Sequence, residues 1–176
     1  RKKNIIFVIE SLGLGGAERS LVTLLNNLDY TKYKVDLLLI TQGGILEDEV
    51  PEEVTIISYN IFQKANTIRK TLLRTRYLIA RKFGGKKHDA EKHWRIFHKS
   101  LPKITKNYDI AIAYSQGFST YFTATKITAT KKYAWVNIDY NKAGYSLKFD
   151  LQFYKNFNAI VTVSEEVKQG LERELK

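Results

Sequence analysis

The first thirty residues place an apolar strand, a glycine-rich turn and an amphipathic helix in direct succession. The run Asn4–Ile9 is almost entirely apolar, and three glycines follow it: Gly13, Gly15 and Gly16. Leucines then recur at helical spacing over Ala17–Leu28. This order is typical of the first unit of an α/β domain, in which the turn lies at the carboxyl edge of the sheet, where ligands bind.

The turn also predicts the charge of a ligand. Glycine lets the backbone approach a bound group closely, and the first turn of a helix offers unpaired N–H groups and a partial positive charge. We therefore expect a phosphate or another anion near Gly15 and Gly16. The spacing is not G-x-G-x-x-G, so the glycines alone leave a purely geometric role equally open. Glu10 and Glu18 either recognise hydroxyl groups or are solvated carboxylates.

Strands and helices alternate along the rest of the chain. The further predicted strands are Tyr33–Ile40, Val54–Ser58, Tyr108–Tyr114, Tyr133–Ile138 and Ala159–Val163. The alternation predicts a Rossmann-like, doubly wound parallel sheet of about six or seven strands flanked by helices. The length of 176 residues and the 44% apolar content predict a single domain over residues 1–176 with a real core.

The connecting segments predict the helices. We expect them at Ile61–Phe83, from Asp89 to Lys99 with a kink or a stop at Pro102, from Gly117 to about Ala129, at Tyr145–Asn156 and at Glu165–Leu175. Glu47–Glu53 reads as a loop or short turn, and Ser164 as the N-cap of the last helix. In the helix at Ile61–Phe83, the residues Ile68, Leu72, Ile79 and Phe83 fall along one face.

Three segments resemble one protein family. The sequence Gly15-Gly16-Ala17-Glu18-Arg19 resembles the GGAER signature of family 4 retaining glycosyltransferases, which have the GT-B fold. Lys132–Asp139 (KYAWVNID) is similar to a K-x-A-W-[VI]-H-x-D segment of many such enzymes. Asn158–Lys168 (NAIVTVSEEVK) is similar to the D-x-I-V-x-V-S-E-x-V-K segment that closes their first domain. The three matches occur in the family's order.

The resemblance implies the acceptor-side half of a two-domain enzyme, whose C-terminal nucleotide-binding domain lies outside this chain. The full hexosyltransferase would move a sugar from a nucleotide-sugar donor to a lipid-linked or polysaccharide acceptor in cell-envelope glycan synthesis. This half alone is expected to be inactive. No metal is implied, because protein dipoles and basic groups can replace it in this fold. No cofactor is implied either, because the nucleotide sugar is a substrate. Gly15 and Gly16, and also Gly13, would contact the donor diphosphate.

The resemblance also implies site residues. Asn137, Asp139 and Gln116 would line the reacting centre, and Glu18, Ser115 and Gly117 the acceptor or sugar site. Asn137 stands where the family often has His, and Gln116 where it often has Glu. Asn and Gln form hydrogen bonds but cannot carry a proton at neutral pH. Either the substrate contacts here are neutral, or an acid/base pair is lost. Equally, both residues could merely cap chain ends.

The net charge of +11 comes from one segment. Residues 64–106 contain 14 Lys/Arg and 2 Asp/Glu, so the remainder is close to neutral. The segment could be a solvated face, a nucleic-acid footprint or a patch for anionic lipid. We expect no nucleic acid, because no recognition motif accompanies the charge. Relatives that act on lipid-linked acceptors favour the membrane reading, hence a cytoplasmic protein peripheral to the inner membrane face.

Other function classes have less support. A non-catalytic α/β module that binds an anionic ligand or nucleic acid through residues 64–106 remains the alternative. A nicotinamide-dependent Rossmann protein has the wrong glycine spacing. His88, His93 and His98 recur every five residues and drift off one helical face, so we expect solvated histidines rather than metal ligands. The chain has no cysteine and no G-x-S-x-G or H-E-x-x-H motif, which leaves hydrolases unsupported.

Overall fold

The computed structural model describes residues 1–58, 67–83, 85 and 88–174. Within these residues, six strands form one sheet in the order β3-β2-β1-β4-β5-β6, and every neighbouring pair is parallel. The strands are β1 (Lys3–Ile9), β2 (Tyr33–Leu39), β3 (Val54–Ser58), β4 (Asn107–Ala113), β5 (Thr128–Val136) and β6 (Ala159–Thr162). The predicted doubly wound, Rossmann-like fold is confirmed.

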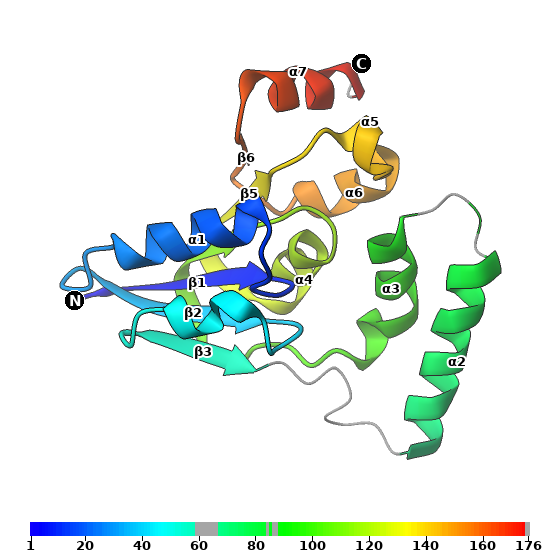
Figure 1. The fold of residues 1–176 in the computed structure, drawn as a ribbon, viewed down its shortest axis with the longest axis horizontal. Helices are drawn as coiled ribbons and strands as arrows, with labels where there is room; N and C mark the ends of the chain where they lie inside the picture. Colours follow the sequence, from blue (N-terminus) through cyan, green and yellow to red (C-terminus); the bar gives the residue numbers. More distant parts are fainter. Residues whose placement is uncertain (59–66, 84, 86–87, 175–176) are drawn as a thin grey trace.

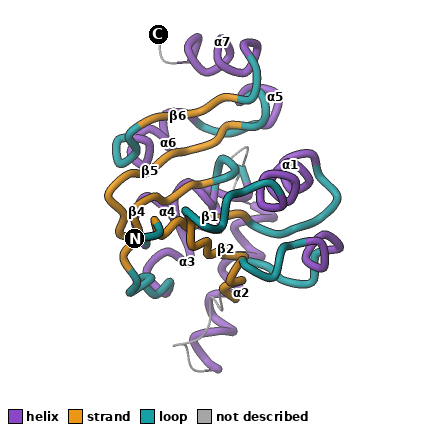
Figure 2. The backbone as a smooth tube through the Cα atoms, turned by 90° about the vertical axis from the view of Figure 1, so that its left-hand side faces the viewer, coloured by secondary structure: helices purple, strands orange, loops and turns teal. Residues whose placement is uncertain are grey.

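Each face of the sheet packs against its own helices (Figures 1 and 2). In β1, Ile5, Phe7 and Ile9 face the cluster formed with α1 (Gly16–Asn26) and the 3-10 helix η1 (Ile45–Glu49). Ile6 and Val8 face the opposite cluster, formed with α3 (Asp89–Phe97) and α4 (Phe118–Lys126). All five side chains are buried, which explains why the strand reads as a continuous apolar run.

The helix that precedes α3 in the sequence lies on its outer side. α2 (Thr67–Phe83) packs on α3 and lies away from the sheet (Figure 1). Residues 61–66 of the predicted helix lie outside the described residues. After α3, the 3-10 helix η2 (His98–Ser100) ends before Pro102, so the helix stops there rather than running on with a kink.

The chain around β5 differs from its prediction. α4 ends at Lys126, not near Ala129, and β5 begins at Thr128, five residues before the predicted start at Tyr133. The extra residues pair with the beginning of β4, where Asn107 lies opposite Thr128. Partners distant in sequence therefore decide the secondary structure of residues 128–132, which periodicity cannot detect.

The segment after β5 contains two helices rather than one. α5 (Tyr140–Ala143) ends at Gly144, which has φ +74°, and α6 covers Leu147–Tyr154 instead of the predicted Tyr145–Asn156. Asp150, only 1% exposed, joins α4, α5 and α6. Its carboxylate accepts hydrogen bonds from the hydroxyls of Tyr121 (2.5 Å) and Tyr140 (2.8 Å). Burial raises the pKa of Asp150 to about 6.

The last helix, α7 (Glu165–Glu174), packs on α5 (Figure 1). Its first turn is capped as predicted, because the Ser164 hydroxyl accepts a hydrogen bond from Val167 N–H over 3.3 Å. Among the described helices, none is both long enough and apolar enough to cross a bilayer.

Candidate functional site

A cavity opens at the carboxyl edge of the sheet, where the strand order reverses. β1 and β4 are neighbours, but the chain leaves β1 toward β2 and leaves β4 toward β5. Ligands of open α/β sheets bind at such a switch point. The cavity has a volume of about 550 Å³ and is lined by Gly16, Ala17, Glu18, Ser20, Tyr114, Ser115, Gln116, Trp135, Asn137, Ile138 and Val163.

One wall of the cavity is the start of α1. Gly15 is the N-cap of this helix, Gly16 its first residue, and both are exposed. No side chain caps the helix, and within the described part of the chain the N–H groups of Gly16, Ala17 and Glu18 have no hydrogen-bond partner. The first turn of α1 therefore presents several N–H donors and its partial positive charge to the cavity.

The carboxylate of Glu18 folds back over this turn. A Cβ added at Gly15 would collide with Oε2 of Glu18, so the carboxylate lies directly against the Gly15 backbone. A negative side chain in the first turn of a helix is favourable because it opposes the helix dipole. The Glu18 carboxylate thus occupies the space beside the start of α1. Desolvation, and to a smaller extent the charge of Glu18, raises the pKa of Glu10. The Glu10 side chain nevertheless keeps access to solvent.

The opposite wall contains Gln116 and Asn137, which are joined across the ends of β4 and β5. Oε1 of Gln116 accepts a hydrogen bond from Asn137 N–H over 3.0 Å, and Nδ2 of Asn137 donates to the Tyr114 carbonyl over 2.7 Å. Gln116 is only 5% exposed. Its amide nitrogen has no partner within the described residues and is not sealed from solvent. That nitrogen is therefore a donor that a ligand in the cavity can use.

Two aromatic residues complete the wall. Tyr114 and Trp135 stack with ring centroids 5.6 Å apart and planes 13° apart, and the Tyr114 hydroxyl lies 3.1 Å from Ser20 Oγ. Neither was singled out from the sequence as a site residue. The signal was available, because Trp135 and Asn137 are two positions apart at the end of a strand and so share one face.

Of the other predicted site residues, some line this cavity and some do not. Ser115 lines it, and its hydroxyl donates to Ser119 Oγ over 2.9 Å. Asp139 lines an adjoining cavity with Asn137, Lys142 and Glu166 instead. Gly13 follows β1 without lining the main cavity.

Gly117 is buried behind the cavity rather than lining it. Its φ of +79° turns the chain into α4, and a Cβ there would lie 2.9 Å from Tyr145 and 3.0 Å from Ala90. Since both the conformation and the space favour glycine, Gly117 shapes the turn that positions Gln116.

The three histidines pack against aromatic rings, so the expectation of solvated histidines is wrong. His88 stacks on Tyr145 at 3.8 Å, and His93 lies between Phe118 (4.9 Å) and Phe97 (4.6 Å). Burial lowers the pKa of His93 to about 4, which keeps its ring neutral. Nδ1 of His98 lies 3.0 Å from the Trp94 carbonyl. Within the described residues, no three His, Cys, Asp or Glu side chains are grouped to hold a metal.

No protein-family model matches this chain, and no curated protein matches it either.

Proposed function

We propose that the cavity binds the diphosphate and the sugar of a nucleotide-sugar donor, and that the chain is the acceptor-side domain of a retaining GT-B glycosyltransferase of family 4. The longer enzyme would transfer the sugar to a lipid-linked or polysaccharide acceptor in cell-envelope glycan synthesis. A second Rossmann-like domain would hold the nucleotide. The GGAER resemblance supports this assignment, since Gly15 and Gly16 lie at the exposed start of α1.

One observation carries the proposal. The amide nitrogen of the nearly buried Gln116 and the N–H groups of Gly16 and Ala17 have no hydrogen-bond partner among residues 1–58, 67–83, 85 and 88–174, and all three residues line one cavity. All of these groups are hydrogen-bond donors held by rigid elements. A ligand rich in oxygen atoms and negative charge satisfies them, and a diphosphate joined to a sugar has both properties.

Each residue of the cavity has a role that follows from the chemistry of its side chain or backbone. The N–H groups at the start of α1 stabilise the charge that develops on the leaving diphosphate. Nε2 of Gln116 and the side-chain oxygen of Asn137 bind sugar hydroxyls, and Trp135 supplies an apolar surface for a sugar ring. Neither Gln116 nor Asn137 titrates near neutral pH, so they bind and orient the sugar without transferring a proton. From the adjoining cavity, Asp139 orients a hydroxyl group of the sugar or acceptor.

Calorimetric titration of the purified chain tests the proposal. The ligands are UDP-glucose, UDP-N-acetylglucosamine and GDP-mannose, with the corresponding nucleoside monophosphates and free sugars as controls. We expect at least one sugar nucleotide to bind at least tenfold more tightly than its monophosphate. Equal binding of the monophosphate, or no binding of any sugar nucleotide at millimolar concentration, overturns the proposal. Sugar transfer by this chain alone would contradict its assignment as half of an enzyme.

A further inference from the structure

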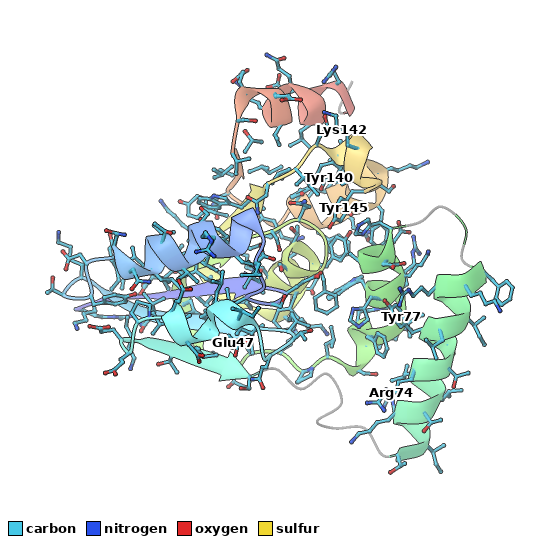
Figure 3. The ribbon with its side chains drawn as sticks, viewed as in Figure 1. Glu47, Arg74, Tyr77, Tyr140, Lys142 and Tyr145 are labelled. Carbon is cyan, nitrogen blue, oxygen red and sulfur yellow. The ribbon has the colours of Figure 1, made fainter. Side chains whose placement is uncertain are left out.

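α2 carries apolar side chains on two faces, and one of them packs on the rest of the described chain while the other does not. Leu73 is buried in the cluster that includes α3, and the half-buried Tyr77 lies on the side toward α3 (Figure 3). The Tyr77 ring lies 5.2 Å from His93 and 5.7 Å from Phe97. The sequence pattern predicted a different apolar face for this helix, formed by Ile68, Leu72, Ile79 and Phe83. None of these four residues is part of the core.

Those four residues form a second apolar face that is open to solvent. At about 100° per residue they fall within an arc of about 60° on the helix surface. We call them the exposed stripe, and their exposed fractions are 80% for Ile68, 56% for Leu72, 55% for Ile79 and 73% for Phe83. Several large apolar side chains along one face of a helix mark an interaction surface, whereas singly scattered ones do not.

Basic side chains border the exposed stripe on both sides. On the helix surface, Arg69 and Arg76 follow Phe83 on one side, and Lys82 lies on the other. The helix contains six Lys/Arg and no Asp or Glu over its 17 residues. Lys82 Nζ lies 5.4 Å from the Phe83 ring, so charge and apolar surface meet directly. The partner of this surface therefore has to offer an apolar region beside negative charge.

These properties select among possible partners. A second copy of the chain would bring two helices of the same strong positive charge together, which is unfavourable. A bilayer that contains anionic lipids offers acyl chains for the exposed stripe and negative headgroups for its basic borders. α2 also lies at the outside of the molecule, beyond α3, so its length is accessible (Figures 1 and 2).

We propose that α2 docks the protein onto an anionic bilayer, with the exposed stripe inserted at the boundary between headgroups and acyl chains. Each basic residue near the surface strengthens the attraction, while the stripe anchors the helix parallel to the membrane plane. The proposal rests on α2 alone and does not depend on the donor assignment.

Vesicle co-sedimentation of the chain tests the proposal. The vesicles contain phosphatidylcholine alone or with 30 mol% phosphatidylglycerol. The test variant is the double substitution Ile79→Ser and Phe83→Ser, which changes exposed side chains only. The matched control is Leu78→Ser, because Leu78 is also 62% exposed on α2 but lies about 80° or more from the stripe. A third variant, Arg76→Glu, reverses one bordering charge. Circular dichroism verifies the helix content of each variant.

We expect the partition coefficients of wild type and Leu78→Ser on the anionic vesicles to agree within twofold. Both proteins should bind weakly or not at all to neutral vesicles. The partition coefficient of the stripe variant falls at least fivefold. Arg76→Glu loses the electrostatic part of the binding, which is the part that high salt also removes. Equal loss in Leu78→Ser overturns the proposal. So does a dimer in solution that the stripe variant disrupts, binding only to an acidic amphipathic peptide, or binding to RNA that survives loss of the stripe.

Discussion

Oε1 of Gln116 lies 3.0 Å from the main-chain nitrogen of Asn137 and accepts its hydrogen bond, which ties the end of β5 to the turn after β4. The sequence left two roles open for these residues, ligand contact and capping of a chain end. The structure shows the capping contact, because the oxygen of Gln116 accepts a hydrogen bond from the backbone, while its nitrogen has no partner in the part of the chain that the structure describes.

Replacing Gln116 separates these two roles. Gln116→Glu keeps an oxygen for Asn137 N–H but removes the donor and adds a negative charge in the cavity. We expect about tenfold weaker binding of pyrophosphate, measured by calorimetry, together with a lower thermal stability because the added charge is largely buried. Gln116→Met removes the acceptor as well and is expected to lower the free energy of unfolding by about 1–3 kcal/mol. Pyrophosphate binding that is unaffected by Gln116→Glu contradicts a site at this position.

The proposed diphosphate site predicts that Glu18 competes with an incoming anion at the start of α1. Glu18→Gln removes the negative charge that lies against Gly15. We expect pyrophosphate to bind three- to tenfold more tightly to this variant, while unfolding in urea shows a loss of about 0.3–1 kcal/mol because a favourable dipole interaction is gone. The exposed Glu172→Gln on α7 removes the same charge at a distance and serves as the control. Equal gains in both variants would indicate net charge rather than the site.

Two glycines near the site differ in what they tolerate. Gly117→Ala forces a φ of +79° on a residue with a Cβ and pushes that Cβ against Tyr145 and Ala90. We expect a loss of about 1–3 kcal/mol in the free energy of unfolding. Gly15→Ala meets only the flexible end of Glu18 and has an ordinary φ of −71°, so its loss stays below about 1 kcal/mol. Urea denaturation compares the two, and equal losses would be inconsistent with this account.

His93 makes the fold sensitive to acid. Its folded pKa of about 4 lies below the unfolded value near 6.5, so the unfolded chain takes up the proton first as the pH falls. Wild type therefore loses stability between about pH 6.5 and 4, and His93→Phe does not lose this contribution.

The stability of His93→Phe relative to wild type should rise by on the order of 2 kcal/mol across this range. Asp150, with its raised pKa of about 6, contributes the opposite slope, but it is present in both proteins and cancels in the comparison. Chemical denaturation at a series of pH values measures the difference. A constant difference would show that His93 titrates normally.

The sequence predicted the sheet better than it predicted the surfaces of the helices. The apolar run of β1 and the glycines after it predicted the carboxyl edge of the sheet, and the structure brings Gln116 and Asn137, which the family resemblance had implied, together at that edge. Periodicity failed at α2, because it detects an apolar face without showing whether that face meets the core or solvent. Leu73 and Tyr77, which make the contact, fall outside the stripe that the pattern emphasised.

Local pattern also missed features that depend on distant partners. The first five residues of β5 are strand because β4 lies beside them, and the histidines are packed because rings from α2, α4 and the loop before α6 reach them. Tyr114 reaches the site by stacking on Trp135, a contact between neighbouring strand ends, whereas the position of Trp135 two residues before Asn137 was visible in the sequence.

Pyrophosphate titration of the ¹⁵N-labelled chain, followed by NMR, tests the central claim most directly, because the nucleoside-diphosphate sugars of the proposal all contain this group. We expect saturable shifts of the main-chain amides of Gly15, Gly16 and Ala17 and of the side-chain amide of Gln116. The basic helix α2 is a competing anion surface within the same sample. Shifts confined to α2, with the start of α1 and Gln116 unchanged, would contradict the account.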